Sequence, residues 1–320
     1  MNFIKKSWNV IKILLTLVLL GLFVLYFINN REDFAAVFAT PLWIVLLLFG
    51  LTSLHFFING LFVLRLLKGF GRLIGGMESF YISIISSLAN YFIPMQGGAA
   101  IRSVYLKKTL NFPYAHFIAS LYGNYIVIFG VNALIALVTL AMIQLRIAPV
   151  PLALFAFFGL LLAVILVLTL IRVRVDPEKA GESKVLRKIL EVLNKILKGW
   201  GMISGDRGLL LGLVWITLGN FAVMTAIYAL EFYTLGVSAN LLTILLYNCL
   251  AGVSLLISLT PGALGIREGI FFLTSDVLGI SGEGIMQLAL LDRGLTVLTL
   301  FLWFLVLSGW KLVISNKSAK

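Results

Sequence analysis

The segment Thr260–Glu268, TPGALGIRE, places an arginine and a glutamate beside helix-breaking residues in one of the most apolar regions of the sequence. An ionised side chain inside a bilayer is costly unless it faces a partner or a polar cavity. Arg267 presents a planar fork of N–H donors that suits a phosphate diester, and Glu268 can balance its charge. The residues that would bend the backbone are Pro261, Gly262 and Gly265. We interpret the segment as a hairpin tip that binds an anionic group.

A similar segment, Pro94–Arg102 or PMQGGAAIR, follows an earlier apolar run. Its polar side chains are Gln96 and Arg102. Proline removes a backbone donor and glycine tolerates turn conformations, so both residue types favour a break in a helix. The residues of this kind are Pro94, Gly97 and Gly98. We interpret the segment as a second hairpin of the same kind, with Gln96 and Arg102 near its tip.

Two adjacent charged residues, Asp292 and Arg293, lie in the last apolar run. Arg293 joins Arg102 and Arg267 as a third candidate for binding an anionic headgroup. Asp292 is suited to neutralise Arg102 or Arg267, or to carry a coupling proton. Two alternatives remain open. Arg267 could pair with a carboxylate simply to lock the hairpins, and Arg102 could extend to the membrane interface.

Several asparagines also fall within apolar runs. Asn90 and Asn124 are candidates for lining the same cavity, and Asn220 and Asn248 lie at similar levels. The alternative is that these amides form hydrogen bonds between helices, which is the commoner use of asparagine in membranes. Glu231 ends another apolar run, and we expect it at the membrane interface.

The composition indicates a membrane protein with several spans. Hydrophobic residues make up 61% of the 320 residues, and several apolar runs reach about 18 residues or more. The net charge of +12 comes from basic residues between those runs, which argues against nucleic acid as a partner. One cysteine and two histidines exclude an intramolecular disulfide and leave few metal ligands. We expect no metal, no cofactor and no catalytic residues.

We expect six apolar runs to cross the bilayer as helices. Lysines before the first run and after the last run place both termini in the cytoplasm by the positive-inside rule. We expect a multi-pass protein of the cell membrane, with residues 1–320 forming a single domain and the first run acting as a signal anchor. The predicted spans are residues 11–28, 41–64, 114–144, 152–171, 209–231 and 285–310.

The runs beside the two Pro/Gly segments are shorter. Residues 80–93 would form a helix of roughly 21 Å, too short for a hydrocarbon core of about 30 Å. The predicted fold is therefore an all-α integral membrane protein with about six full transmembrane helices and two re-entrant Pro/Gly hairpins. The hairpins would belong to an inverted repeat, residues 41–145 and 209–311. Because residues 241–259 are long enough to cross, eight or more full spans remain an alternative.

The long polar segment 172–207 is rich in lysine and arginine. Within it, residues 183–200 alternate apolar and charged side chains with the period of a helix. We expect a basic amphipathic helix that lies on the anionic cytoplasmic leaflet.

The paired motifs resemble those of the transmembrane region of the lysylphosphatidylglycerol synthase family, a flippase-like domain. In that family a first motif, P-G-x-x-G-E-x-x-R, is followed late in the chain by P-G-x-x-G-x-R-E and by an arginine in the last span. Pro261, Gly262, Gly265, Arg267 and Glu268 match the second motif, and Arg293 matches the late arginine.

The first motif departs from the family pattern. Pro94, Gly98 and Arg102 fit it, but Met95 stands where glycine is usual and Ala99 stands where the acid is usual. The sequence ends at Lys320, so we expect a free-standing member without the soluble synthase domain. The resemblance implies movement of an anionic phospholipid or a polyprenyl-phosphate-linked lipid between leaflets.

Three functions follow as hypotheses. The first is a lipid flippase whose intramembrane arginines hold the headgroup. The second is a membrane enzyme acting on a lipid phosphate, which would need a base or a metal site. The third is an accessory subunit that docks a soluble transferase through the basic segment 172–207. A homo-oligomer is left open as well.

Overall fold

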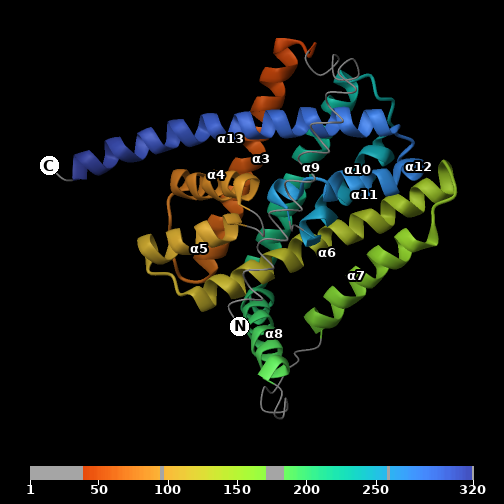
Figure 1. Ribbon diagram of the computed structural model, residues 1–320. Helices are drawn as coiled ribbons and strands as arrows, with labels where there is room; N and C mark the ends of the chain where they lie inside the picture. The colour runs from red at the N-terminus through yellow and green to blue at the C-terminus, as the bar shows by residue number, and fades with distance from the viewer. Residues whose placement is uncertain (1–38, 94–96, 171–183, 258–259, 319–320) are drawn as a thin grey trace. The chain divides into compact units, whose positions relative to one another are not determined.

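The computed structural model describes residues 39–93, 97–170, 184–257 and 260–318 (Figure 1). Within these ranges all the regular structure is helical and no strand occurs, which confirms the all-α prediction. The elements are α3 (Leu42–Gly69), α4 (Gly76–Phe92), α5 (Gly97–Leu110), α6 (Tyr114–Arg146), α7 (Leu152–Leu170), α8 (Lys184–Gly205), α9 (Arg207–Thr234), α10 (Leu241–Val253), η2 (Ser254–Ile257), η3 (Pro261–Ala263), α11 (Ile266–Leu273), α12 (Ser275–Leu278) and α13 (Gly282–Ser318).

Five of the described helices, α3, α6, α7, α9 and α13, are long and apolar enough to cross a membrane. They correspond to the second to sixth predicted spans, while the predicted span 11–28 lies outside the described residues. Several helices run past the predicted ends, because no residue breaks the helix where the apolar run stops. In α3 the break comes only at Gly71, whose φ of 71° lets the Arg72 N–H bond to the Leu67 carbonyl at 2.9 Å.

The chain packs into two units, and each takes helices from both predicted repeats. Unit 1 comprises Met1–Phe57, Phe80–Arg102 and Phe221–Lys320. Unit 2 comprises Ile58–Ser79 and Ser103–Asn220. The inverted repeat itself stays a prediction.

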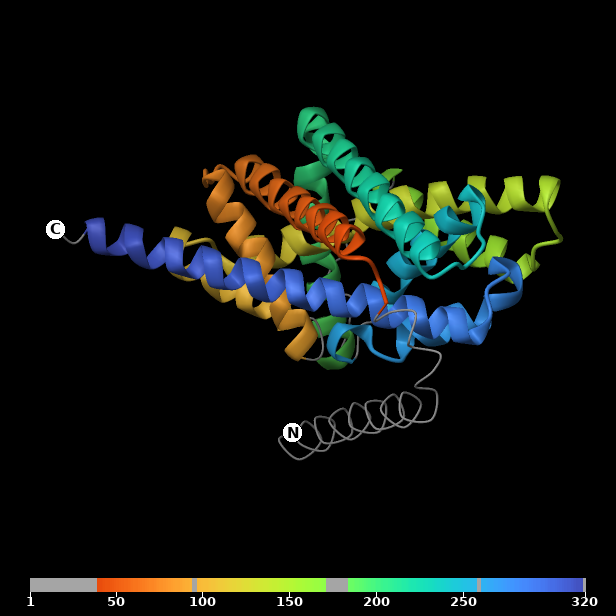
Figure 2. The same ribbon diagram turned by 90° about the horizontal axis from the view of Figure 1, so that it is seen from above.

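Unit 1 is built around the long helix α13, which is continuous over 37 residues (Figure 2). One apolar cluster joins α13 to α3 and α9, through Ile44, Leu48, Ile227, Leu291 and Leu295. A second cluster joins α13 to α3 and α4, through Phe56, Phe80, Ile84, Leu300 and Leu307. The Trp303 indole also donates to the Ser53 hydroxyl at 2.8 Å.

Short helices flank both Pro/Gly segments, as predicted. Helices α4 and α5 have 17 and 14 residues, or roughly 26 Å and 21 Å at 1.5 Å per residue. Residues 241–259 do not form one full span in the described part: α10 ends after 13 residues at Val253 and the 3₁₀ turn η2 follows. The helix thus tightens to a 3₁₀ turn within a run that composition alone marked as long enough to cross. Re-entry into the membrane stays a prediction.

One detail of the first hairpin differs from expectation. Gly97 and Gly98 were expected in the turn, but they form the start of α5. Glycine is needed there for close packing, because a Cβ atom on Gly98 would lie 2.0 Å from the Ser86 carbonyl oxygen of α4. Pro94 and Gln96 lie outside the described residues.

Unit 2 contains the neighbouring helices α6 and α7 and the amphipathic helix α8 (Figure 1). The predicted helix 183–200 is observed as Lys184–Gly205. Trp200 and Ile203 of α8 are buried against Ile126 and Val127 of α6 and against neighbouring side chains of α3 and α9. Part of the apolar face of α8 therefore packs on protein, and its contact with a leaflet stays a prediction.

Candidate functional site

The second Pro/Gly segment forms a tight left-handed turn. Gly262, Ala263 and Gly265 have φ angles of 58°, 53° and 78°, a region that glycine enters readily. The turn is closed by the Thr260 hydroxyl, which donates to the Leu264 carbonyl at 2.8 Å, and by the Ala263 N–H, which donates to the Thr260 carbonyl at 3.0 Å. The turn delivers the chain into α11 with Arg267 and Glu268 in its first turn.

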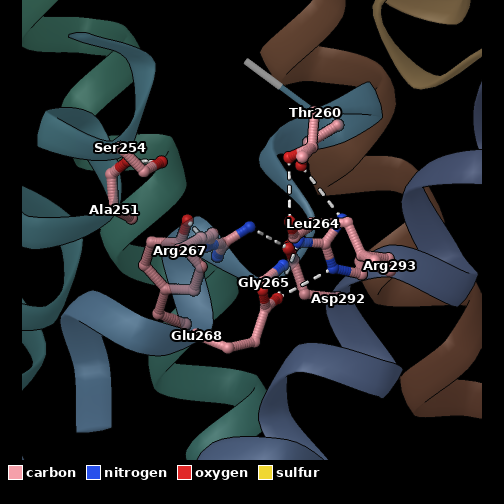
Figure 3. Close-up of polar contacts among 11 residues, drawn as sticks. Ala251, Ser254, Thr260, Leu264, Gly265, Arg267, Glu268, Asp292 and Arg293 are labelled. Atoms are coloured by element: carbon pink, nitrogen blue, oxygen red, sulfur yellow. Dashed lines mark hydrogen bonds and ion pairs between the residues drawn. The ribbon is translucent and has the colours of Figure 1, made fainter. Parts of the chain in front are cut away.

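Glu268 connects this turn to the last helix (Figure 3). Its Oε2 accepts a hydrogen bond from the Gly265 N–H at 2.7 Å and so caps α11. Its Oε1 accepts from both Nη2 and Nε of Arg293, at 2.6 Å and 3.0 Å. Arg293 Nη1 donates to the Gly262 carbonyl at 3.0 Å, so one guanidinium binds both the helix cap and the turn.

Arg267 forms the second ion pair of the site. Its Nη1 lies 2.6 Å from Asp292 Oδ2, and its Nη2 donates to the Tyr228 hydroxyl at 3.0 Å. The guanidinium carbon is 5.6 Å from the ring centroids of both Tyr228 and Phe271, within the range of cation–π attraction. Its Nε is buried and has no hydrogen-bond partner among the described residues.

The four charged side chains are almost fully withdrawn from solvent. Arg267 and Asp292 are 14% and 6% exposed, and Arg293 and Glu268 are 11% and 9% exposed. Two positive and two negative charges balance, so the network is neutral as a group. Because each guanidinium is held by a carboxylate, an incoming phosphate would have to take the place of that carboxylate.

The first motif contributes contacts of its own within unit 1. Arg102 Nε donates to the Ser86 hydroxyl of α4 at 3.1 Å, and the Gly98 N–H donates to Asn90 Oδ1 at 2.8 Å. Arg102 is thereby held against α4. Spacing could have revealed this surface of α4, because Ser83, Ser86 and Asn90 recur three and four residues apart.

The two motifs approach one another at Tyr91. A Cβ atom on Gly262 would lie 3.1 Å from Tyr91 Cδ1 and 3.2 Å from Arg293 Nη1. Tyr91 directly follows Asn90, which holds the start of α5. The end of α4 therefore packs against the turn of the second motif, next to one of its arginines.

The other asparagines bond between helices. Asn220 donates to the side-chain Oδ1 of Asn59 at 3.3 Å, and Asn248 donates to the Phe221 backbone carbonyl at 3.0 Å and to the Thr225 hydroxyl at 2.9 Å. Asn124, predicted to line the binding site, lies on α6 in unit 2, whereas the charged network belongs to unit 1. The grouping of Asn124 with the network stays a prediction.

Two residues of this region, Tyr228 and Tyr91, were missed by the sequence analysis, although each contacts or adjoins an arginine of the network. Glu231 was expected at the membrane interface, and its depth in the membrane stays a prediction. It is only 1% exposed, because α9 continues to Thr234 and its end packs within unit 1. The spacing of Tyr228 and Glu231, three residues apart on one helix, was the available signal.

These features define an all-helical, multi-pass membrane protein with buried ion pairs beside a broken helix. No group of three or more His, Cys, Asp and Glu side chains suited to a metal ion occurs in the described part of the chain. The family model for the lysylphosphatidylglycerol synthase TM region matches residues 9–303, and the chain belongs to this family. Comparison with curated proteins and with solved structures gave no match.

Proposed function

We propose that this protein is a flippase, not an enzyme, which moves an anionic phospholipid or a polyprenyl-phosphate-linked lipid between the leaflets of the cell membrane. The observation that carries the proposal is the pair of buried arginines, Arg267 and Arg293, beside a broken helix. A buried arginine in a membrane protein usually faces a partner or a transport path. Membership of the flippase-like family supports the same function.

Exchange of partners is the proposed binding step. The phosphate of the lipid takes the place of Asp292 on Arg267, whose Nε is an additional donor. Arg293 keeps its three bonds to Glu268 and Gly262 and so holds the turn in shape. The acyl chains stay in the surrounding lipid while the headgroup lies at the turn.

The proposed path uses the hairpins. Both Pro/Gly segments re-enter the membrane, with their tips near the midplane, and rocking of one repeat against the other exposes the headgroup to each leaflet in turn. Both termini are cytoplasmic, and α8 lies on the anionic inner leaflet. Exposure of Arg187 and Glu191 on α8 is consistent with a polar outer face of that helix.

A leaflet-resolved assay in proteoliposomes tests the proposal. Fluorescent phosphatidylglycerol is placed in both leaflets, and a membrane-impermeant reductant reports the fraction that reaches the outside over time. The informative variant combines Arg267→Gln with Asp292→Asn, because it removes the cation without leaving a lone buried charge. We expect wild-type protein to move the lipid and the double variant to lose at least about tenfold in rate, one lost charged hydrogen bond being enough.

The matched control is Arg146→Gln, which removes an exposed arginine at the end of α6. We expect this variant to transport at the wild-type rate. Unchanged transport by the Arg267→Gln, Asp292→Asn variant, with its thermal unfolding midpoint preserved, would remove Arg267 from the mechanism.

A further inference from the structure

Glu231 is a buried carboxyl group for which the exchange of partners described above has no use. It is 1% exposed, and its Oε2 has no hydrogen-bond partner within the described residues. Ile227, one turn earlier on α9, belongs to the same apolar cluster as Leu291 and Leu295 of α13. Because Asp292 adjoins Leu291, Glu231 and Asp292 lie on two helices that this cluster joins.

The titratable and charged groups that act on Glu231 come from four helices. Tyr228 lies one turn earlier on α9, Tyr247 on α10, Arg267 on α11 and Asp292 on α13, and each interacts electrostatically with its carboxyl group. Arg267 is the cation among them, and it is already bound to Asp292 at 2.6 Å. The hydroxyl of Tyr247 is also buried and has no partner among the described residues.

A proton on Glu231 is the state that this geometry favours. A second carboxylate beside Asp292 would be buried without a donor of its own, and burial of an unpaired charge costs several kcal/mol. Two neighbouring carboxyl groups in a site of low polarity instead share a proton. A metal cation is disfavoured in place of this proton, because the positive guanidinium of Arg267 already acts on the same carboxyl group.

Release of Arg267 to a phosphate would leave Asp292 without its partner. The carboxylate would then be buried beside the bound anion, which is an unfavourable arrangement. A protonated Glu231 can remove this obstacle by donating its O–H to the freed oxygen of Asp292. Such O–H···O⁻ bonds are short and roughly twice as strong as bonds between neutral groups.

We propose that protonated Glu231 is a positioning residue. It replaces Arg267 as the hydrogen-bond donor to Asp292 when Arg267 binds the anionic headgroup. The inference rests on the proposed function. The proton stays within the carboxyl pair: the O–H of Glu231 donates to Asp292 in the lipid-bound state and returns to its earlier environment on release. Lipid movement therefore requires a protonated Glu231 and slows as the pH rises.

The transport test compares Glu231→Gln with Glu231→Ala across a range of pH, using fluorescent phosphatidylglycerol in proteoliposomes. The glutamine amide is a permanent donor, so we expect Glu231→Gln to be active and independent of pH, while the wild-type rate falls at alkaline pH. Glu231→Ala has no donor and should be slower than wild type at low pH by about tenfold. Glu283→Gln, at the exposed start of α13, is the control and should keep the wild-type pH profile.

An infrared measurement tests the proton itself without any transport. Purified wild-type protein at neutral pH should display the C=O stretch of a protonated carboxylic acid, which Glu231→Gln lacks and Glu283→Gln keeps. Absence of this band in the wild type overturns the inference, and so does a Glu231→Gln variant with the wild-type pH profile. If the band is present but wild-type protein moves no lipid, the proposed function fails while the protonation of Glu231 stands.

Discussion

In both Pro/Gly hairpins a side chain caps the start of a helix by accepting a hydrogen bond from a glycine N–H, but the capping side chains differ. Gly98 and Gly265 occupy the same place in the two motifs, four residues after the proline. The N–H of Gly98 donates to the neutral amide of Asn90 on α4, at 2.8 Å. The N–H of Gly265 donates instead to the carboxylate of Glu268, at 2.7 Å, within its own helix.

The first hairpin is therefore capped by a neutral side chain and the second by a charged one. Ala99 replaces the acid of the first motif, and the cap comes from a neighbouring helix, so the cap itself adds no charge. Glu268 caps α11 and also binds Arg293, so the charge of the second hairpin depends on its cap. We infer that the first hairpin holds the framework and the second carries the binding chemistry.

The largest effect should come from breaking the charged cap. Arg293→Met leaves the Glu268 carboxylate buried without its cation, and Glu268→Gln leaves the guanidinium without its anion. Removal of one partner of a buried ion pair typically destabilises by about 3–5 kcal/mol. The double variant leaves no lone charge, so we expect it to lose less stability than either single variant, as measured by chemical unfolding in detergent.

A surface ion pair serves as the control for these single and double variants. Arg187 and Glu191 of α8 are 3.5 Å apart, with side chains 66% and 48% exposed. Their removal should change stability by only a few tenths of a kcal/mol. Equal losses for the buried and exposed pairs would contradict the role assigned to Glu268 and Arg293.

The next largest effect should come from Gly98→Ala in the first hairpin. The added Cβ would lie 2.0 Å from the Ser86 carbonyl oxygen and 2.6 Å from Asn90 Oδ1, so α5 must move away from α4. We expect a lowered thermal unfolding midpoint. The control is Gly269→Ala in α11, where a Cβ has no atom within 4 Å and alanine favours the helix by up to about 1 kcal/mol. A stable Gly98→Ala variant would mean that α4 and α5 are not closely packed.

The smallest effect within the two hairpins should come from Asn90. Asn90→Ala removes the cap of α5 and should cost about 1 kcal/mol, whereas Asn90→Asp keeps an acceptor and should retain most of the stability. Thermal unfolding in detergent measures both. If Asn90→Ala also abolished lipid movement while its stability was preserved, the first hairpin would be more than a framework.

The fold was predictable wherever a single physical rule decides the outcome. Apolar length marked α3, α6, α7, α9 and α13, and helical periodicity marked α8. Helix ends were less predictable, since the end of α3 depends on the left-handed turn at Gly71 and not on polarity. The change from α-helix to 3₁₀ turn after Val253 was not predicted, and a full span over residues 241–259 had been left open as an alternative.

The charged residues of the site were predictable, but their pairing was not. Charged residues are rare in apolar runs, and this was enough to single out Arg267, Glu268, Asp292 and Arg293. Which carboxylate binds which arginine depends on the left-handed turn at Gly262 and on the packing of α11 against α13, and neither follows from spacing. Tyr228 was overlooked, and the burial of Glu231 was not predicted, for a similar reason, because their contacts arise from the other helices packed against α9.

The central claim is that Arg267 binds an anionic lipid headgroup, and native mass spectrometry of the purified protein tests it most directly. Wild-type protein and the Arg146→Gln control should retain an anionic phospholipid when the detergent is removed. The Arg267→Gln, Asp292→Asn variant should lose that lipid while keeping the wild-type unfolding midpoint. Equal retention of the lipid by the double variant and the wild type would contradict the claim.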